Sequence, residues 1–243
     1  MIDLHNGDCL EVMKSIPDGS VDCIITDPPY GTTACKWDSV IPFEPMWEQL
    51  KRIIKPNGAI VLFGSEPFSS ALRMSNIEQY KYDWKWEKSK ASNFPHAPNM
   101  PLKIFEDVMV FSGGIIGHAS QVGGRRLPYY PQGVVVGTTI VKRNKNTSEL
   151  RYHRESQTNH TTGYKCKGEN YPKTHLKFKS ENGLHPTQKP VALLEYLIKT
   201  YTQENETVLD FTMGSGSTMI ACLNTNRKGI GIELDKHYFD VAT

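Results

Sequence analysis

Short apolar runs alternate with segments of helical periodicity along most of this chain. Residues 2–6, 21–26, 59–63, 82–88 and 107–111 are predicted as strands, and residues 9–16, 43–54 and 67–76 as helices. The run at residues 59–63 is apolar throughout, as is typical of a strand in a parallel sheet covered on both faces. The pattern therefore predicts an α/β fold, with a mostly parallel twisted sheet and helices on both faces.

The alternation resumes after residue 184. Pro190 suits the first turn of a helix, in which Val191, Leu194, Ile198 and Tyr201 recur at helical spacing. A short strand at residues 207–210, a helix at 219–224 and a strand at 229–233 are expected to follow. Residues 1–111 and 185–243 are thus predicted to form one domain.

Residues 112–184 lack this periodicity and are too long for a passive connection inside a compact domain. They hold 12 Lys and Arg against 4 Asp and Glu, which makes the rest of the chain net acidic. One interpretation is a solvated, disordered insertion. We favour a nucleic-acid contact region, because basic side chains neutralise phosphates and aromatic rings stack on unpaired bases. The interleaved aromatic residues are Tyr129, Tyr130, Tyr152, Tyr164, Tyr171 and Phe178.

Composition narrows the class of protein further. The chain of 243 residues is 38% hydrophobic and 22% charged, as expected for a folded domain with an insertion, and no apolar run is long enough to cross a membrane. Its 5 cysteines are dispersed, so neither a disulfide framework nor a metal site is expected. The opening residues lack the basic start and apolar stretch of a signal peptide, which predicts a cytoplasmic protein.

The predicted strand at residues 21–26 runs directly into Asp27, Pro28, Pro29 and Tyr30. Two consecutive prolines cannot donate hydrogen bonds to a sheet, and each fixes its own φ angle, so the chain leaves the sheet on a rigid turn. A carboxylate, a fixed carbonyl and a flat ring on such a turn could hold a planar amine. The alternative is an ordinary turn that ends a strand, with a surface aspartate and a packed tyrosine.

The segment from residue 207 to Glu233 has the form of a βαβ unit with a glycine turn. Gly214 and Gly216 would let a ligand approach the backbone, and Glu233 lies where an acid can reach ribose hydroxyls. A dinucleotide site would need a third glycine where Met219 stands, and no Gly-Lys-Ser/Thr sequence forms a phosphate loop. A nucleoside cofactor without a pyrophosphate fits better, and S-adenosylmethionine is the common one.

Together these motifs resemble the amino-methylating DNA methyltransferases. Four segments carry the resemblance: residues 27–30, 185–190, 210–218 and 231–235, with further matches at residues 6–8 and 105–111. The catalytic motif comes first and the cofactor loop last, which is the circularly permuted order of the beta class. The resemblance implies a three-layer, Rossmann-like S-adenosylmethionine-dependent methyltransferase fold, with residues 112–184 as the inserted target-recognition region.

The resemblance also implies roles for individual residues. Asp27 and the Pro28 carbonyl would accept hydrogen bonds from the two hydrogens of a nucleobase amine, which frees the nitrogen lone pair to attack the methyl group. Pro29 completes the turn, and Tyr30 is expected to lie against a base rotated out of the duplex. The residues expected at the cofactor are Asp8 at its adenine, Glu233 at its ribose, Phe211, Gly214 and Gly216 at its methionine part, and Asp210, Ser217, Thr218, Thr187 and Lys189 as further candidates.

Several functional alternatives remain. Asp27 favours N6 of adenine in double-stranded DNA over N4 of cytosine, since family members with Ser at this position usually modify cytosine. Methylation of RNA or of a protein glutamine is less favoured, because those relatives commonly have Asn here. A non-catalytic DNA-binding module is also less favoured, because the site motifs are intact. A companion restriction endonuclease and a homodimer are both left open.

Overall fold

The computed structural model describes residues 1–32, 38–135, 140–142, 163–165, 170–181 and 188–243. The chain divides into two units, one of Met1–Tyr130 with Thr174–Thr243 and one of Pro131–Lys173. The second unit contains an antiparallel pair of strands, β6 (Ile140–Lys142) and β7 (Gly163–Lys165). It is shorter than the segment 112–184 expected to be inserted, since residues 112–130 and 174–181 belong to the first unit.

The first unit is built on an eight-stranded sheet with the order β1-β10-β9-β2-β3-β5-β4-β8. Strands pair in parallel from β1 through β3, whereas β5 runs antiparallel to both β3 and β4. The strands are β1 (Ile2–Asn6), β2 (Val21–Thr26), β3 (Ile54–Gly64), β4 (Tyr80–Ser92), β5 (Lys103–Phe111), β8 (His175–Lys177), β9 (Thr207–Asp210) and β10 (Lys228–Glu233). The predicted mostly parallel sheet is therefore present.

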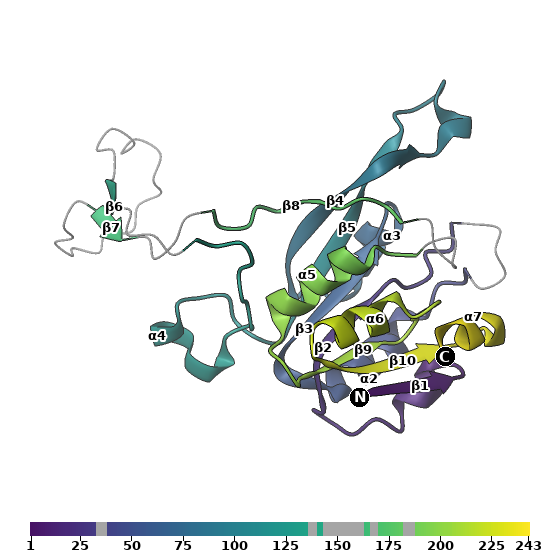
Figure 1. The fold of residues 1–243 in the computed structure, drawn as a ribbon, viewed down its shortest axis with the longest axis horizontal. Helices are drawn as coiled ribbons and strands as arrows, with labels where there is room; N and C mark the ends of the chain where they lie inside the picture. The colour runs from purple at the N-terminus through teal and green to yellow at the C-terminus, as the bar shows by residue number, and fades with distance from the viewer. Residues whose placement is uncertain (33–37, 136–139, 143–162, 166–169, 182–187) are drawn as a thin grey trace. The chain divides into compact units, whose positions relative to one another are not determined.

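Helices cover both faces of this sheet (Figure 1). Alternate side chains of a strand point to opposite faces, so Cys23 and Ile25 pack under α5 (Val191–Tyr201) and α6 (Ser217–Asn224), while Ile24 packs against the other layer. That layer consists of α1 (Cys9–Met13), α2 (Phe43–Ile53) and α3 (Phe68–Ser75). The remaining helices are α4 (Ala119–Val122), α7 (Lys236–Ala242) and the 3-10 turns η1 (Phe94–His96) and η2 (Gly123–Arg125).

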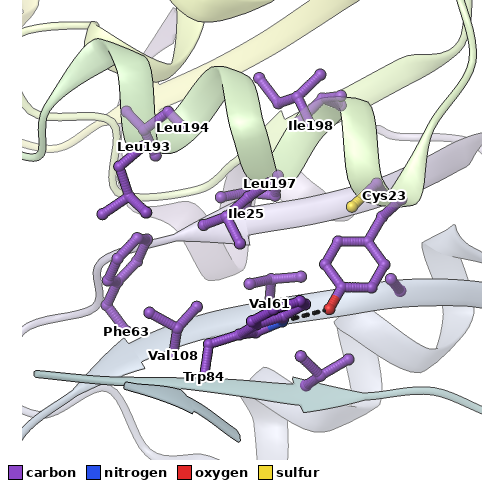
Figure 2. Close-up of a cluster of buried hydrophobic side chains, with 14 of the residues drawn as sticks. Cys23, Ile25, Val61, Phe63, Trp84, Val108, Leu193, Leu194, Leu197 and Ile198 are labelled. Atoms are coloured by element: carbon purple, nitrogen blue, oxygen red, sulfur yellow. Dashed lines mark hydrogen bonds between the residues drawn. The ribbon is translucent and has the colours of Figure 1, made fainter. Parts of the chain in front are cut away.

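One buried hydrogen-bond group lies in the core under α5 (Figure 2). The hydroxyl of Tyr201 accepts a hydrogen bond of 2.7 Å from the indole nitrogen of Trp84 and lies 3.0 Å from the hydroxyl of Tyr82. Tyr201 and Trp84 are both almost fully buried. These hydrogen bonds thereby join the last turn of α5 to strand β4, which lies next to the edge strand β8.

Two aromatic residues expected to contact nucleic acid have another role. The ring of Tyr129 lies 6.5 Å from that of Trp84, and the ring of Phe178 lies 5.7 Å from that of Tyr196. Both pack against the core of the first unit, so the expectation of base stacking is corrected for them. Tyr171 in the second unit is 49% exposed, and the side chains of residues 152 and 164 lie outside the described part of the chain.

Several predicted elements have different bounds in the structure, and among them α1 ends at Met13 rather than at residue 16 and β5 begins at Lys103 rather than at residue 107. Strand β3 runs from Ile54 to Gly64, so it begins five residues before the predicted strand at 59–63. Strand β4 extends to Ser92, and helix α6 begins two residues earlier than its apolar pattern. No helix in the described part of the chain has the length and apolar character that a membrane span needs.

We predict that Tyr201→Phe destabilises the first unit by about 1–3 kcal/mol, because it leaves the buried indole nitrogen of Trp84 without its acceptor. Urea unfolding followed by circular dichroism measures the change. Tyr171→Phe is the matched control. It also removes a tyrosine hydroxyl, but that ring is half exposed, so the midpoint of urea unfolding should not change. Equal midpoints for wild type and Tyr201→Phe would contradict the role given to this hydrogen bond.

Candidate active site

A cavity of about 970 Å³ opens where strands β1, β2, β9 and β10 end. The carboxyl ends of parallel strands meet at one edge of a sheet, so loops far apart in sequence come together there. The lining includes most of the residues predicted from sequence, namely Asp8, Asp27, Pro28, Pro29, Tyr30, Lys189, Asp210, Phe211, Gly214, Ser217, Thr218 and Glu233. The structure thus brings the Asp-Pro-Pro-Tyr turn and the glycine turn to a single cavity.

Both carboxylate oxygens of Asp27 accept hydrogen bonds. Oδ1 accepts one from the hydroxyl of Tyr30, and Oδ2 accepts one from the ammonium group of Lys189. The ring of Tyr30 stacks on that of Phe68, with centroids 5.0 Å apart. The Asp27 side chain is 20% exposed at the wall of the cavity, where these two hydrogen bonds fix its orientation.

The electrostatics of this group are set by burial and by two acids that share one lysine. Burial raises the pKa of Asp27 above its ordinary value; Lys189 opposes this rise, and Glu106 adds to it. Burial also disfavours the charged form of Lys189, but Asp27 and Glu106 outweigh it and raise its pKa. Glu106 has a lowered pKa, because Lys189 and Lys88 together outweigh the effect of its burial. Lys189 therefore remains an ammonium group between two carboxylates.

Asp210 ties the catalytic turn to the cofactor loop. Its Oδ1 accepts hydrogen bonds from the hydroxyl of Thr26 at 2.5 Å and from the backbone N–H of Thr212 at 3.1 Å. Its Oδ2 accepts one from the hydroxyl of Thr218 at 2.5 Å. The Thr212 hydroxyl in turn donates to the carbonyl of Asp27 at 3.1 Å. The ends of β2 and β9 are thereby held by side chains as well as by the sheet.

The glycine turn between β9 and α6 requires conformations that suit glycine. Gly214 has a φ of 54° and Gly216 a φ of 83°, both in the left-handed region. Gly216 forms the N-cap of α6, where an added Cβ would lie 3.0 Å from the Cβ of Ala242. The backbone N–H of Gly214 donates a hydrogen bond of 2.9 Å to Oε2 of Glu233. The turn and the acid that ends β10 are therefore one structural unit.

Two acids lie at the adjacent ends of β1 and β10. Asp8 caps helix α1 through a hydrogen bond of 2.8 Å from the N–H of Leu10, and the N–H of Gly7 donates to the carbonyl of Glu233 at 3.0 Å. The second oxygen of Glu233 accepts from the N–H of Asp235 at 2.7 Å, and burial raises the Glu233 pKa. Both carboxylates line the cavity beside Phe211, as hydroxyl and amine acceptors for a nucleoside would.

Some predicted residues lie elsewhere, and the sequence did not reveal others. Gly216 is not part of the cavity lining, and Thr187 lies outside the described residues. Lys189, expected at the cofactor, forms its ion pairs with Asp27 and Glu106. Glu106 lies in the segment 105–111 that matches the family, but it was not predicted as a site residue because the sequence does not show that this strand places it beside Asp27. Among the described residues, no three His, Cys, Asp or Glu side chains are grouped as metal ligands.

Comparisons of the sequence and of the structure with known proteins agree on one family. A family model described as DNA methylase, N6_N4_Mtase, matches residues 21–243. The Type II methyltransferase M.HpaI of Haemophilus parainfluenzae is 28% identical over 96% of this chain and 70% of its own length. The crystal structure of the M1.HpyAVI-SAM complex is 26% identical, with a TM-score of 0.63, and the match covers 100% of this chain and 98% of that one. The cytosine-N4-specific PvuII DNA methyltransferase shares the fold, with a TM-score of 0.67 at 15% identity over 99% of this chain and 84% of its own.

We predict that Asp210 makes the stability of the protein depend on pH. Burial raises its pKa from 3.8 to about 6, so between these values the native state holds a proton that the unfolded chain releases. Its contribution to stability is therefore complete below pH 3.8 and is lost as the pH rises through about 6.

The free energy of unfolding of wild type minus that of Asp210→Asn should accordingly fall by on the order of 2–3 kcal/mol from pH 4 to pH 7. Denaturant unfolding at several pH values measures this difference. Parallel stability curves for the two proteins would show that the Asp210 pKa is not raised.

Proposed function

Because this chain belongs to the DNA methylase family whose model spans residues 21–243, we propose that it methylates the N6 amino group of adenine in duplex DNA, with S-adenosylmethionine as methyl donor. One observation carries the proposal: the Asp-Pro-Pro-Tyr turn and the glycine turn line one cavity and are joined through Asp210. A base amine held by the first turn would therefore lie beside a cofactor held by the second.

The residues of the cavity fit S-adenosylmethionine. Glu233 and Asp8 offer carboxylate oxygens to a ribose and to an adenine amine, and Phe211 offers an apolar ring. The glycine turn brings backbone close to the cavity without a side chain in the way. When bound, this cofactor supplies a methyl group activated by a sulfonium ion. The M1.HpyAVI structure, 26% identical to this chain, is itself described as a complex with SAM.

The chemistry required of the protein is to make an aromatic amine nucleophilic. The lone pair of such an amine is delocalised into the ring. The Asp27 carboxylate and the Pro28 carbonyl each accept a hydrogen bond from one N–H of the amine, which draws the nitrogen toward tetrahedral geometry and localises its lone pair. Pro28 and Pro29 hold this acceptor pair on a turn with fixed φ angles, so little reorganisation is needed when the amine arrives.

Tyr30 gives the target base a surface to lie on. The base must rotate out of the duplex to reach Asp27, at a cost of a few kcal/mol. Phe68 stacks on the Tyr30 ring, and the Tyr30 hydroxyl is held by Asp27, so the ring has a fixed orientation at the cavity wall. Stacking of a base on a fixed aromatic ring is worth about 1–3 kcal/mol, which offsets much of the cost of rotation.

The choice of adenine rests on Asp27 at the first position of the motif, and N4 of cytosine is the alternative target. The PvuII enzyme, described as cytosine-N4-specific, resembles this chain in fold alone at 15% identity and does not favour that alternative. Digestion of duplex DNA treated with the purified protein, followed by mass spectrometry of the nucleosides, should yield N6-methyladenine. N4-methylcytosine as the product would overturn the assignment.

We assign DNA recognition to the basic segment of residues 112–184, which contains the second unit, Pro131–Lys173. Side chains from an irregular basic segment can contact phosphates and base edges, as site recognition requires. A companion endonuclease with the same site is the partner we expect on DNA, since the similar M.HpaI is named a Type II methyltransferase.

We predict that Asp27→Ala lowers the rate of methyl transfer by roughly 100-fold or more, because the amine loses its charged acceptor. Transfer of a radiolabelled methyl group from S-adenosylmethionine to duplex DNA measures the rate. Asp18→Ala is the control, since this exposed aspartate pairs with Arg52 and does not line the cavity. Near-normal turnover by Asp27→Ala would rule out the proposed mechanism.

We predict that Gly216→Val weakens S-adenosylmethionine binding at least about tenfold, because valine is strained at a φ of 83° and its Cβ would press on Ala242. Isothermal titration calorimetry measures the affinity, and circular dichroism checks that the variant is folded. Gly124→Val is the matched control, because an added Cβ there meets no atom within 4 Å. Wild-type affinity in folded Gly216→Val would contradict the placement of the cofactor against this turn.

A further inference from the structure

The carboxylate that must receive the target amine already holds an ammonium group. Lys189 donates to Oδ2 of Asp27, and Tyr30 donates to Oδ1. The Lys189 side chain is only 8% exposed, and its Nζ lies 5.1 Å from the centre of the Phe63 ring. A buried ammonium group is costly unless it is paired with an opposite charge, so the hydrogen bond to Asp27 stabilises Lys189 in this position.

A second carboxylate lies on the other side of the same ammonium group. Oε2 of Glu106 is 3.3 Å from Nζ of Lys189, which is a longer contact than the one Lys189 makes with Asp27, and this oxygen has no other hydrogen-bond partner among the described residues. Oε1 of Glu106 pairs with Lys88 at 3.1 Å. An acceptor with capacity for one more donor is therefore available next to Lys189. A shorter contact with Lys189 would satisfy this buried oxygen more fully.

These contacts bear on the reaction because an ammonium group and a base amine are both N–H donors. The amine must donate to Asp27, where Lys189 now donates. We propose that Lys189 is a positioning residue that holds Asp27 ionised and in place until substrate arrives, and then moves onto Glu106 as the amine takes its position on Asp27. This inference rests on the proposed amine methylation, and it gives Glu106 a role as the receiving acceptor.

The exchange keeps the charge inside the cavity balanced. Lys189 keeps a carboxylate partner throughout, and Asp27 exchanges the ammonium donor for the amine donor, so neither group is left without a hydrogen bond when the amine binds. Before binding, burial raises the pKa of Asp27 above its ordinary value, and the ammonium group of Lys189 limits that rise. After the exchange the cation lies farther from Asp27, so the carboxylate becomes a stronger acceptor when the amine is in place.

The groups that face Asp27 come from every neighbouring element. They are Lys189 before α5, Glu106 on β5, Tyr30 on the same turn and Asp210 on β9, with Lys88 of β4 beyond Glu106. Lys189 lowers the pKa of Asp27, whereas Glu106 raises it. Removal of the Lys189 side chain alone should therefore raise the Asp27 pKa, and removal of the Glu106 side chain alone should lower it. A general loss of structure would not shift the pKa in opposite directions in the two variants.

The test uses Lys189→Met and Glu106→Gln in the full-length protein. The Asp27 carboxyl is titrated by carbon-13 NMR without DNA or cofactor, and its signal is assigned with Asp27→Asn. The pKa should rise by about one unit or more in Lys189→Met and should fall in Glu106→Gln. Lys199→Met, on the exposed face of α5, is the matched control and should leave the titration unchanged.

The pH profile of methyl transfer gives the second readout. Its acidic limb should shift to higher pH in Lys189→Met and to lower pH in Glu106→Gln, with the plateau rate of Glu106→Gln about tenfold lower because the ammonium group has lost its charged acceptor. Lys189→Arg keeps the charge and should retain the wild-type limb. Cofactor affinity, measured by calorimetry, should stay within about threefold of wild type in all of these variants.

Each outcome decides between the interpretations. An unchanged Asp27 titration in both variants, or shifts of the same sign, would overturn the proposal. A loss of cofactor affinity in Lys189→Met with an unmoved acidic limb would instead make Lys189 a cofactor ligand. If the wild-type protein methylates no DNA, the proposed function fails, whereas the NMR titration of the free protein still tests the pairing of Lys189 with Asp27.

Discussion

The hydrogen bonds to Asp210 are the constraint on which the site depends. A buried carboxylate is costly unless its oxygens are satisfied, and here Thr26, Thr212 and Thr218 satisfy them. Thr26 immediately precedes the Asp-Pro-Pro-Tyr turn, and Thr212 lies in the loop that leads to the glycine turn. A displacement of either loop would break these hydrogen bonds to a buried carboxylate, at a cost in stability. The distance between the two halves of the site is therefore set by the core.

The order of the strands explains why these loops meet. Along the sheet, β9, β10 and β1 lie on one side of the junction, and β2 and β3 lie on the other. A crevice forms where neighbouring parallel strands lead to connections on opposite sides, and ligands bind at the carboxyl ends there. Chain order does not matter to this geometry. A catalytic turn near residue 27 and a cofactor turn near residue 214 can thus form one site.

Much of this was accessible from the sequence, because the signals were local. The family assignment and the α/β fold are confirmed, since apolar alternation marks strands and a Pro-Pro turn or a Gly-x-Gly turn is visible in a few residues. Contacts across the sheet were not accessible. The pairing of Lys189 with Asp27, and the position of Glu106 beside both, depend on which strands become neighbours. Tyr129 was misassigned for the same reason. The composition of its segment suggested a nucleic-acid interface, whereas its ring packs against Trp84 on β4.

The central claim is that one cavity at this sheet edge holds both the methyl donor and the acceptor of the target amine. A crystal structure of the protein with S-adenosylhomocysteine tests it most directly. We expect the ribose at Glu233, the amino acid part at the glycine turn and the sulfur facing Asp27 across the cavity. A ligand bound elsewhere, or one whose sulfur is separated from Asp27 by ordered protein, would contradict the account.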